Sequence, residues 1–270
     1  MLNSKNYAQG FCEARKDLIK KYAPVWGKVK MCEIEGMTVL ELPSPQLLAG
    51  FSSYLKYHYP GKVYFRGEKQ FHRSTIPSLF RHIHGDVTGD IVRRKQAFDD
   101  LVTSLQSLYS QTRFREDFRP LLQHYGIRTD WLDLVDNIFV ALWFSNHYSR
   151  EEFSYIKFFG DSGLTVVDLR SVHSSLSLRP HCQHGLSATK LLTAWDVNSI
   201  DFSQNMIAIA KLQNTPEMKL SGHIFSDEYM FPKEELDNTL KLLKAKKFQD
   251  NLDKILTRNG LPRNTLGSVQ

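Results

Sequence analysis

The segment Leu121-Leu-Gln-His-Tyr-Gly-Ile-Arg-Thr-Asp-Trp-Leu-Asp133 places a dense polar cluster directly before a strongly apolar run, Asn137-Ile-Phe-Val-Ala-Leu-Trp-Phe144. This run is apolar nearly all the way round a helix, which predicts a buried helix over residues 137–147. An upstream polar patch, Tyr64-Phe65-Arg66-Gly67, ends an expected short strand over residues 62–66. These two patches are the most informative features of the sequence.

The remaining pattern predicts helices mainly in the first half of the chain and strands in the second half. Further helices are expected over residues 4–22, 44–57, 89–115, 120–125 and 232–247. Further strands are expected as two short stretches within 26–42, around a turn at Gly36, and over 155–159, 165–169, 206–212 and 223–226. Helices first and strands later predict an α+β fold and not alternating βαβ units.

The composition is that of an ordinary globular protein, with 41% hydrophobic and 24% charged residues in a chain of 270. The longest apolar run, Ile138 to Phe144, is far shorter than a membrane span. The first residues lack the basic-then-apolar pattern of a signal peptide, and the three cysteines are too scattered for a disulfide framework. We therefore expect a cytoplasmic protein without a membrane segment.

The formal net charge of +6 and the pI near 9.1 permit an anionic partner. The basic residues gather in three places: Arg93-Arg94-Lys95, then Arg113, Arg115 and Arg119, and later Lys241, Lys244, Lys246 and Lys247. The ordinary interpretation of each cluster is a solvated helix face. Their sum, without a compensating acidic tail, keeps nucleic acid as an expected partner, with Arg93, Arg94, Arg113 and Arg115 as the candidate contacts.

The two polar patches resemble the FRG domain, a bacterial module named for its Phe-Arg-Gly signature. The second patch of that family reads roughly Gln-His-Tyr-Gly-x-Pro-Thr-Arg-Leu-Leu-Asp-Trp, followed by an Ala-Leu-aromatic-Phe helix. This chain keeps Gln123, His124, Tyr125, Gly126, Thr129, Leu132 and Asp133. It departs at Arg128, where Pro is common, and at Asp130, where Arg is common. The departures bear on fine substrate specificity more than on the fold.

Two further segments extend the resemblance over most of residues 40–240. Ile76-Pro-Ser-Leu-Phe-Arg81 is similar to the family's Pro-Ser-Leu-Phe-Arg segment, and Arg179-Pro-His-Cys-Gln183-His-Gly185 is similar to its Arg-x-x-x-Gln-x-Gly element. The expected organisation is an N-terminal helix and short extended segment over 1–42, the FRG domain over 43–250, and a C-terminal tail over 251–270.

The order of polar elements is also similar to the ADP-ribosyltransferase superfamily, whose mixed fold clamps NAD between strands. In its arginine–serine–glutamate branch, an Arg on an early strand, a Ser-x-Ser/Thr element and a Glu on a late strand form the site. Here Phe65-Arg66-Gly67, Leu186-Ser187-Ala-Thr189 and Asp227-Glu228-Tyr229 follow in that order. The last of these is similar to the strand around the catalytic Glu of poly-ADP-ribose polymerases. The resemblance implies that NAD is a substrate.

The resemblance also implies roles for single residues. Glu228 would stabilise the oxocarbenium-like ribose that forms when nicotinamide leaves. Arg66 would donate to the pyrophosphate, and Gly67 would allow close backbone approach to the ligand. Tyr125 would stack on nicotinamide or adenine, and His124 would bind ribose or act as a base toward the acceptor. The remaining expected contacts to NAD are Ser187, Thr189 and Gln183.

Ser226 bears on which group accepts the ADP-ribose. It stands two positions before Glu228, where ADP-ribosyltransferases that modify arginine carry a second Glu. With the basic charge, this favours a nucleic-acid base, in RNA or DNA, and a toxin or phage-defence effector with a possible antitoxin partner. Two other functions stay open: a non-catalytic module that binds a nucleotide or nucleic acid through Arg66 and the His124-Tyr125 pair, and an NAD glycohydrolase or nuclease that uses the same site.

Structural interpretations stand beside these roles. In these alternative interpretations, Arg66 is an ordinary arginine at the end of a strand and Glu228 is an exposed carboxylate in a turn. Ser187 and Thr189 are then ordinary strand hydroxyls. We expect Asp133 to support the approach to the buried helix or to pair with Arg128. A metal is not expected, because His181-Cys-Gln-His184 and His82-Ile-His84 lack a partner pair at zinc-site spacing. A Ser or Cys nucleophile with a distant His base stays open.

Overall fold

The computed structural model describes residues 29–83, 86–109, 118–172, 176–190 and 197–269. The helix expected over residues 4–22 and the candidate contacts Arg113 and Arg115 lie outside these ranges. The chain forms two compact units. Unit 1 consists of Met1–Thr75, Leu134–Leu164 and Phe202–Ser226, and unit 2 consists of Ile76–Asp133, Thr165–Asp201 and Asp227–Gln270.

Unit 1 carries most of the strands. Its elements are β1 Lys30–Ile34, β2 Met37–Glu41, α2 Pro45–His58, β3 Val63–Glu68, α5 Ile138–Asn146, β5 Phe153–Gly160, η3 Phe202–Asn205, β8 Met206–Gln213 and α9 Pro216–Gly222. The strands lie in the order β1-β2-β8-β5-β3, and Val135 of β4 (Leu132–Val135) pairs with Phe65 of β3. β2 and β8 are parallel, whereas β1–β2, β8–β5 and β5–β3 are antiparallel, so the sheet is mixed.

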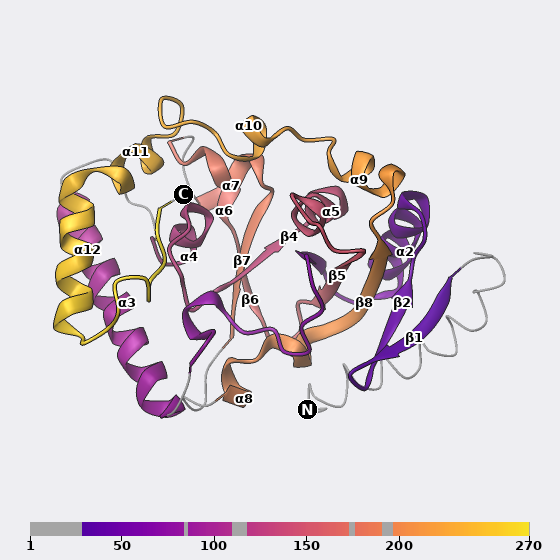
Figure 1. Ribbon diagram of the computed structural model, residues 1–270, viewed down its shortest axis with the longest axis horizontal. Helices are drawn as coiled ribbons and strands as arrows, with labels where there is room; N and C mark the ends of the chain where they lie inside the picture. Colours follow the sequence, from indigo (N-terminus) through magenta and orange to yellow (C-terminus); the bar gives the residue numbers. More distant parts are fainter. Residues whose placement is uncertain (1–28, 84–85, 110–117, 173–175, 191–196, 270) are drawn as a thin grey trace. The chain divides into compact units, whose positions relative to one another are not determined.

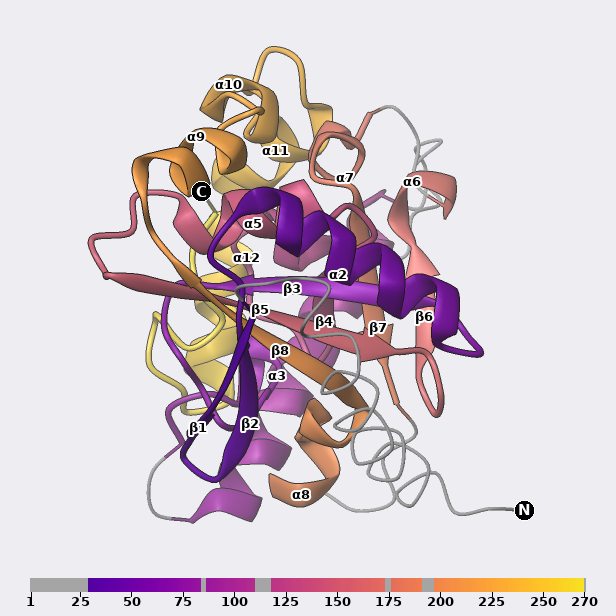
Figure 2. The same ribbon diagram turned by 90° about the vertical axis from the view of Figure 1, so that its right-hand side faces the viewer.

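Local signals in the sequence determine the two main helices of unit 1. The Ser44 hydroxyl accepts from Leu47 N at 3.3 Å and starts α2, with Pro45 as the first helical residue. The Asn137 side chain accepts from Phe139 N at 2.9 Å and starts α5. Helix α5 packs on β3 and β5, and α2 and α9 pack on α5 (Figures 1 and 2). The buried helix expected over 137–147 is therefore confirmed.

Unit 2 carries most of the helices. Its elements are η1 Ser78–Phe80, α3 Val87–Tyr109, α4 Phe118–Leu121, η2 Leu122–Tyr125, β6 Thr165–Asp168, α6 Leu169–Val172, α7 Leu178–Cys182, β7 Gly185–Thr189, α8 Val197–Ile200, α10 Asp227–Met230, α11 Asn238–Lys244 and α12 Lys246–Arg258. β6 and β7 form an antiparallel pair, and α3 and α12 lie side by side (Figure 1). With helices and mixed strand pairing in the described residues, the α+β fold class is confirmed.

The core of unit 2 corrects the expected C-terminal tail. Residues 251–258 complete α12, and Leu252, Ile255, Leu256 and Leu266 are buried in the same apolar cluster as residues of α3. The boundary at residue 250 would therefore cut through a packed helix. The boundary at residue 42 would separate β1 and β2 from β8, with which β2 pairs.

Two expectations about the late part of the chain are wrong. Residues 223–226 form no strand, because His223 N donates to Lys219 O and Leu220 O at the end of α9, and Ile224 is 62% exposed. The helix expected to begin at Pro232 begins at Asn238 instead. The buried Asp237 carboxylate accepts from Leu240 N at 3.0 Å and sets that start. None of the described helices combines the length and apolar character needed to span a bilayer.

Candidate functional site

The first polar patch lies on β3 of unit 1. Arg66 and Glu68 are two residues apart, so their side chains share one face of the strand. Arg66 Nε donates to Glu68 Oε1 at 3.0 Å, and the two side chains are only 15% and 9% exposed. Glu68 thereby holds the guanidinium in one orientation. Arg66 was expected at the end of the strand, but β3 continues for two more residues, to Glu68.

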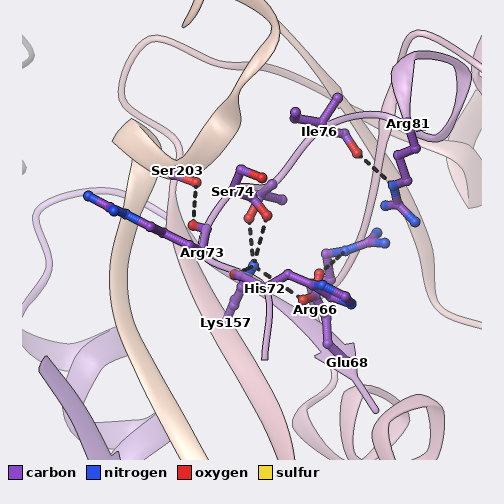
Figure 3. Close-up of polar contacts among 10 residues, drawn as sticks. Arg66, Glu68, His72, Arg73, Ser74, Ile76, Arg81, Lys157 and Ser203 are labelled. Atoms are coloured by element: carbon purple, nitrogen blue, oxygen red, sulfur yellow. Dashed lines mark hydrogen bonds and ion pairs between the residues drawn. The ribbon is translucent and has the colours of Figure 1, made fainter. Parts of the chain in front are cut away.

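Lys157 completes this patch from the neighbouring strand. It lies opposite Arg66 in the β3–β5 pair and is fully buried. Its Nζ donates to His72 O at 2.6 Å and Thr75 Oγ1 at 2.8 Å, with Ser74 O at 3.4 Å (Figure 3). These hydrogen bonds fasten the 72–75 loop to the sheet. We call Arg66, Glu68, Lys157 and this loop the Lys157 cluster.

Glu68 is charged within this cluster. Its Oε2 lies 3.2 Å from Lys157 Nζ and forms an ion pair with it. Burial favours the neutral acid, but the charges of Arg66 and Lys157 outweigh burial and lower the pKa of Glu68. Both carboxylate oxygens therefore face a cation.

Gly67 has a packing role. A Cβ atom at this position would meet the carbonyl oxygen of Ala141 and lie 2.8 Å from Ser145 N. Both atoms belong to the backbone of α5, so a side chain at this position would force the helix or the strand to shift. The close approach that Gly67 permits is thus that of helix α5, whereas the sequence predicted the approach of a ligand.

The second polar patch lies in unit 2 and centres on His124. Helix η2 ends at Gly126, which adopts a positive φ of 89°. His124 Nδ1 lies 2.7 Å from Gln183 Oε1, and Gln183 Nε2 donates to Met230 O at 2.8 Å. Because the Met230 carbonyl can only accept, the Gln183 amide must turn its NH2 group toward it, and its oxygen then faces His124. Nδ1 of His124 therefore carries a proton and donates to Gln183 Oε1.

The Arg-x-x-x-Gln-x-Gly element surrounds this imidazole. Arg179 Nη1 donates to the His124 carbonyl at 3.2 Å, and Gln183 binds Nδ1. A Cβ atom at Gly185 would lie 2.6 Å from His124 Cε1 and 2.9 Å from Nε2, so the ring fits only against glycine. All three signature residues of the element therefore contact His124. The sequence associated Gln183 with NAD, but the structure shows it orienting the imidazole.

Asp133 is the carboxylate beside this ring. Its Oδ1 lies 3.7 Å from His124 Nε2, and its side chain is 28% exposed, whereas that of His124 is 4% exposed. Among the described residues, Nε2 is buried and has no hydrogen-bond partner. The sequence predicted a supporting role for Asp133 at the start of α5, but Asn137 caps that helix. His124, Gln183, Arg179, Gly185 and Asp133 form what we call the His124 cluster.

Tyr125 supports the cluster from inside the core. It is fully buried, and its hydroxyl donates to Asp237 Oδ1 and Oδ2 at 3.0 and 2.9 Å. Burial and the neighbouring Asp237 raise the pKa of Tyr125. The Arg179 guanidinium lies over the ring, 5.2 Å from its centroid. The predicted stacking on NAD needs an exposed ring face, and this conformation offers none.

The other residues predicted to contact NAD have different surroundings. Ser187 on β7 is buried and donates to Pro120 O at 3.2 Å. Thr189 is the last residue of β7 and pairs with Thr165 of β6. Glu228 is exposed on the single-turn helix α10, so its expected place on a late strand is wrong. Arg66 and Gly67 lie in unit 1 and the remaining residues predicted to contact NAD lie in unit 2, so a shared site stays a prediction.

Much of the basic charge is paired within the chain. Arg94, a predicted nucleic-acid contact, donates to Leu79 O at 3.1 Å and Arg81 O at 2.9 Å, and its side chain is 12% exposed. Arg93 keeps a side chain that is 55% exposed, beside Asp90. Lys95 and Arg119 each pair with Asp99 and Asp130. Within the described residues, no group of three or more His, Cys, Asp or Glu forms a metal site.

The comparisons with known proteins support the FRG part of the resemblance. The sequence model of the FRG domain matches residues 61–153, less than half of the 270-residue chain. This range contains Arg66, Gly67, His124 and Asp133, and the element from Arg179 to Gly185 lies beyond it. Neither a curated protein nor a solved structure gives a significant match. These findings support an FRG domain over residues 61–153.

Proposed function

We propose that this chain is an NAD-dependent ADP-ribosyltransferase that modifies nucleic acid, with His124 as its general base. The carrying observation is the buried Nε2 of His124, which has no hydrogen-bond partner among the described residues. Leaving such an atom without a partner costs about 1–3 kcal/mol, so a bound group that pairs with it would gain that free energy. The cost is understandable if the lone pair receives a proton during a reaction.

The surroundings of His124 suit this role. Gln183 holds the proton on Nδ1, so Nε2 is the atom that accepts another. When it does so, the imidazolium lies 3.7 Å from the Asp133 carboxylate, which stabilises the positive charge. Gly185 and Arg179 fix the ring, so the base is held in place before the substrate arrives.

The choice of NAD rests on the resemblance to ADP-ribosyltransferases. In that scheme Arg66 binds the pyrophosphate, and the bond to Glu68 presents its guanidinium in a fixed plane. Departure of neutral nicotinamide leaves positive charge on the ribose, which a nearby carboxylate stabilises. The basic composition favours a nucleic-acid acceptor, and the proposed biological role is a bacterial toxin or phage-defence effector with an antitoxin partner.

The test uses NAD labelled on its adenine side, incubated with the protein and separate pools of RNA, DNA and protein. Covalent label on RNA or DNA is expected. Label on protein alone would reject the nucleic-acid acceptor, and free ADP-ribose alone would indicate a glycohydrolase. Cleavage of the nucleic acid without NAD would indicate a nuclease, and binding without turnover would indicate a non-catalytic module.

His124→Asn is the decisive variant, because the asparagine amide can still donate to Gln183 but lacks Nε2. We expect transfer to fall by about 10²–10⁴-fold, the range for loss of a general base. The matched control is His223→Gln, since His223 is exposed on unit 1. Near-normal transfer by a folded His124→Asn protein would reject the assignment.

A further inference from the structure

Asp237 joins the two elements that hold His124. Its side chain is fully buried at the start of α11. Oδ1 accepts from Leu240 N at 3.0 Å, and Oδ2 accepts from Arg179 N in α7 at 3.2 Å. The Tyr125 hydroxyl of η2 donates to the same two oxygens, at 3.0 and 2.9 Å. One carboxylate thus connects η2, α7 and α11, which all belong to unit 2.

Two routes lead from Asp237 to the imidazole. Tyr125 is the chain neighbour of His124, so its hydroxyl bond to Asp237 fixes the backbone that carries the ring. On the second route, Arg179 Nη1 donates to the His124 carbonyl at 3.2 Å. One turn later, Gln183 N donates to Arg179 O at 2.9 Å, and the Gln183 side chain accepts from His124 Nδ1. A shift of η2 against α7 would therefore lengthen the bond between the ring and Gln183.

The three donors explain why a carboxylate stands at this position. A helix start needs one acceptor, which Ser, Thr or Asn supplies as well as Asp. Asp237 presents one oxygen to Leu240 N and the other to Arg179 N. An amide has a single oxygen, so its NH2 group would face one of these two backbone N–H groups. The residue type thus fits the junction of η2, α7 and α11, beyond the capping of α11.

We infer that Asp237 is a positioning residue for His124, because its carboxylate keeps the ring bonded to Gln183. Its effect on transfer rests on the proposed function, whereas its effect on the ring does not. In this role Asp237 acts through Tyr125 and Arg179. Loss of one carboxylate oxygen should therefore loosen the His124 ring more than it loosens the rest of unit 2.

Asp237→Asn tests the inference through the Nδ1 proton of His124, which is followed by NMR of the ring nitrogens in the whole chain. The signals of His124 are identified by their absence from His124→Asn. We expect this proton to exchange with water at least about tenfold faster in Asp237→Asn than in the wild type, because the bond to Gln183 opens more often. Unchanged exchange in the folded variant would overturn the inference.

Asp100→Asn is the matched control, because it makes the same chemical change in the same unit. The Asp100 carboxylate of α3 accepts from Gln96 Nε2 at 2.9 Å and from Asn259 Nδ2 at 3.2 Å, and these partners lie outside η2 and α7. The two variants are compared at urea concentrations that give them the same free energy of unfolding. Exchange in Asp100→Asn should then stay within about twofold of the wild type. Equal acceleration in both variants would overturn the inference, since any loosening of unit 2 would then suffice.

Tyr125→Phe decides the question if Asp237→Asn does not fold. It removes the hydroxyl of η2 and leaves Asp237 bonded to Leu240 N and Arg179 N. The Nδ1 proton of His124 should exchange at least about threefold faster than in the wild type, because one of the two routes remains. Exchange at the wild-type rate would overturn the inference.

The transfer assay with labelled NAD gives the second readout. A misplaced base slows the chemical step and leaves the binding of NAD unchanged. Asp237→Asn should therefore lower kcat by about tenfold or more, with KM for NAD within about twofold of the wild type. Normal kcat in a variant whose ring proton exchanges faster would overturn the inference. Absence of transfer by the wild type would reject the proposed function, and the exchange rates would still decide whether Asp237 holds the ring.

Discussion

The Lys157 cluster of unit 1 and the His124 cluster of unit 2 both carry residues of the FRG signature. Their buried polar groups differ in the partners that they contact. In unit 1, both oxygens of Glu68 face cations, and Lys157 gives its protons to the 72–75 loop. In unit 2, the imidazole of His124 is held on every side except at Nε2. The residue types alone do not distinguish the two clusters. Their charge pairing differs: Glu68 Oε2 lacks a hydrogen bond but lies 3.2 Å from the Lys157 ammonium, whereas His124 Nε2 lies 3.7 Å from a carboxylate, and the proposed function uses this second arrangement.

The largest expected effect on stability is that of Lys157→Met. This variant removes the anchor of the 72–75 loop and leaves the buried carboxylate of Glu68 with one cation. Loss of one partner from a buried ion pair costs about 3–5 kcal/mol, and we expect that decrease in the free energy of unfolding by chemical denaturation. Adding Glu68→Gln should recover part of the loss. A stable Lys157→Met protein that loses only transfer would instead place the chemistry in unit 1.

Gly67→Ala tests whether the signature glycine serves packing. The new methyl group would meet the backbone of α5 at Ala141 and Ser145, so we expect a loss of about 3 kcal/mol in the free energy of unfolding. Gly50→Ala is the matched control, because nothing lies within 4 Å of that position in α2. There the substitution should stabilise by about 0.5–1 kcal/mol. Equal effects at both positions would contradict the packing role.

Glu68→Gln adds a dependence on pH. The lowered pKa means that the charge of Glu68 stabilises the folded state above the ordinary glutamate pKa, and this stabilisation is lost as the pH falls through the folded value. At pH 7 the variant should be less stable than the wild type by about 2 kcal/mol, the scale for a charged hydrogen bond. The difference should shrink in acid, where the wild type also becomes neutral. A constant difference from pH 7 to pH 3 would show that charge is not the cause.

The parts of the fold that depend on neighbouring residues were predicted well from the sequence. Helix α2 begins at Pro45 because Ser44 caps it, and α5 follows its apolar run to within a residue or two. The strand expected over 223–226 was wrong, since a short apolar alternation there matches a strand but belongs to the end of α9 and the turn after it. Short patterns of this kind are decided by tertiary contacts.

The candidate site was predictable in its residues but not in its contacts. His124 was identified from its motif, whereas its partner Gln183 lies 59 positions away and was associated with NAD. Lys157 was missed, because it stands in an apolar strand and its partners His72 and Thr75 lie 85 and 82 positions earlier. Asp133 was given a structural role, since nothing in its neighbourhood along the chain shows that it faces His124. Such pairs become visible only when the topology brings them together.

The smallest expected effect is that of Glu228→Gln. This variant tests whether Glu228 acts like the catalytic Glu of poly-ADP-ribose polymerases. The side chain is exposed on a single-turn helix, and not held on a strand as that comparison requires. An exposed carboxylate is surrounded by water, which weakens its action on a developing charge. We therefore expect less than about a threefold change in transfer, against the much larger loss for His124→Asn, in the same assay with labelled NAD. A fall in transfer of about 10²-fold, the scale for removing one preorganised electrostatic group, would instead support a catalytic role for Glu228.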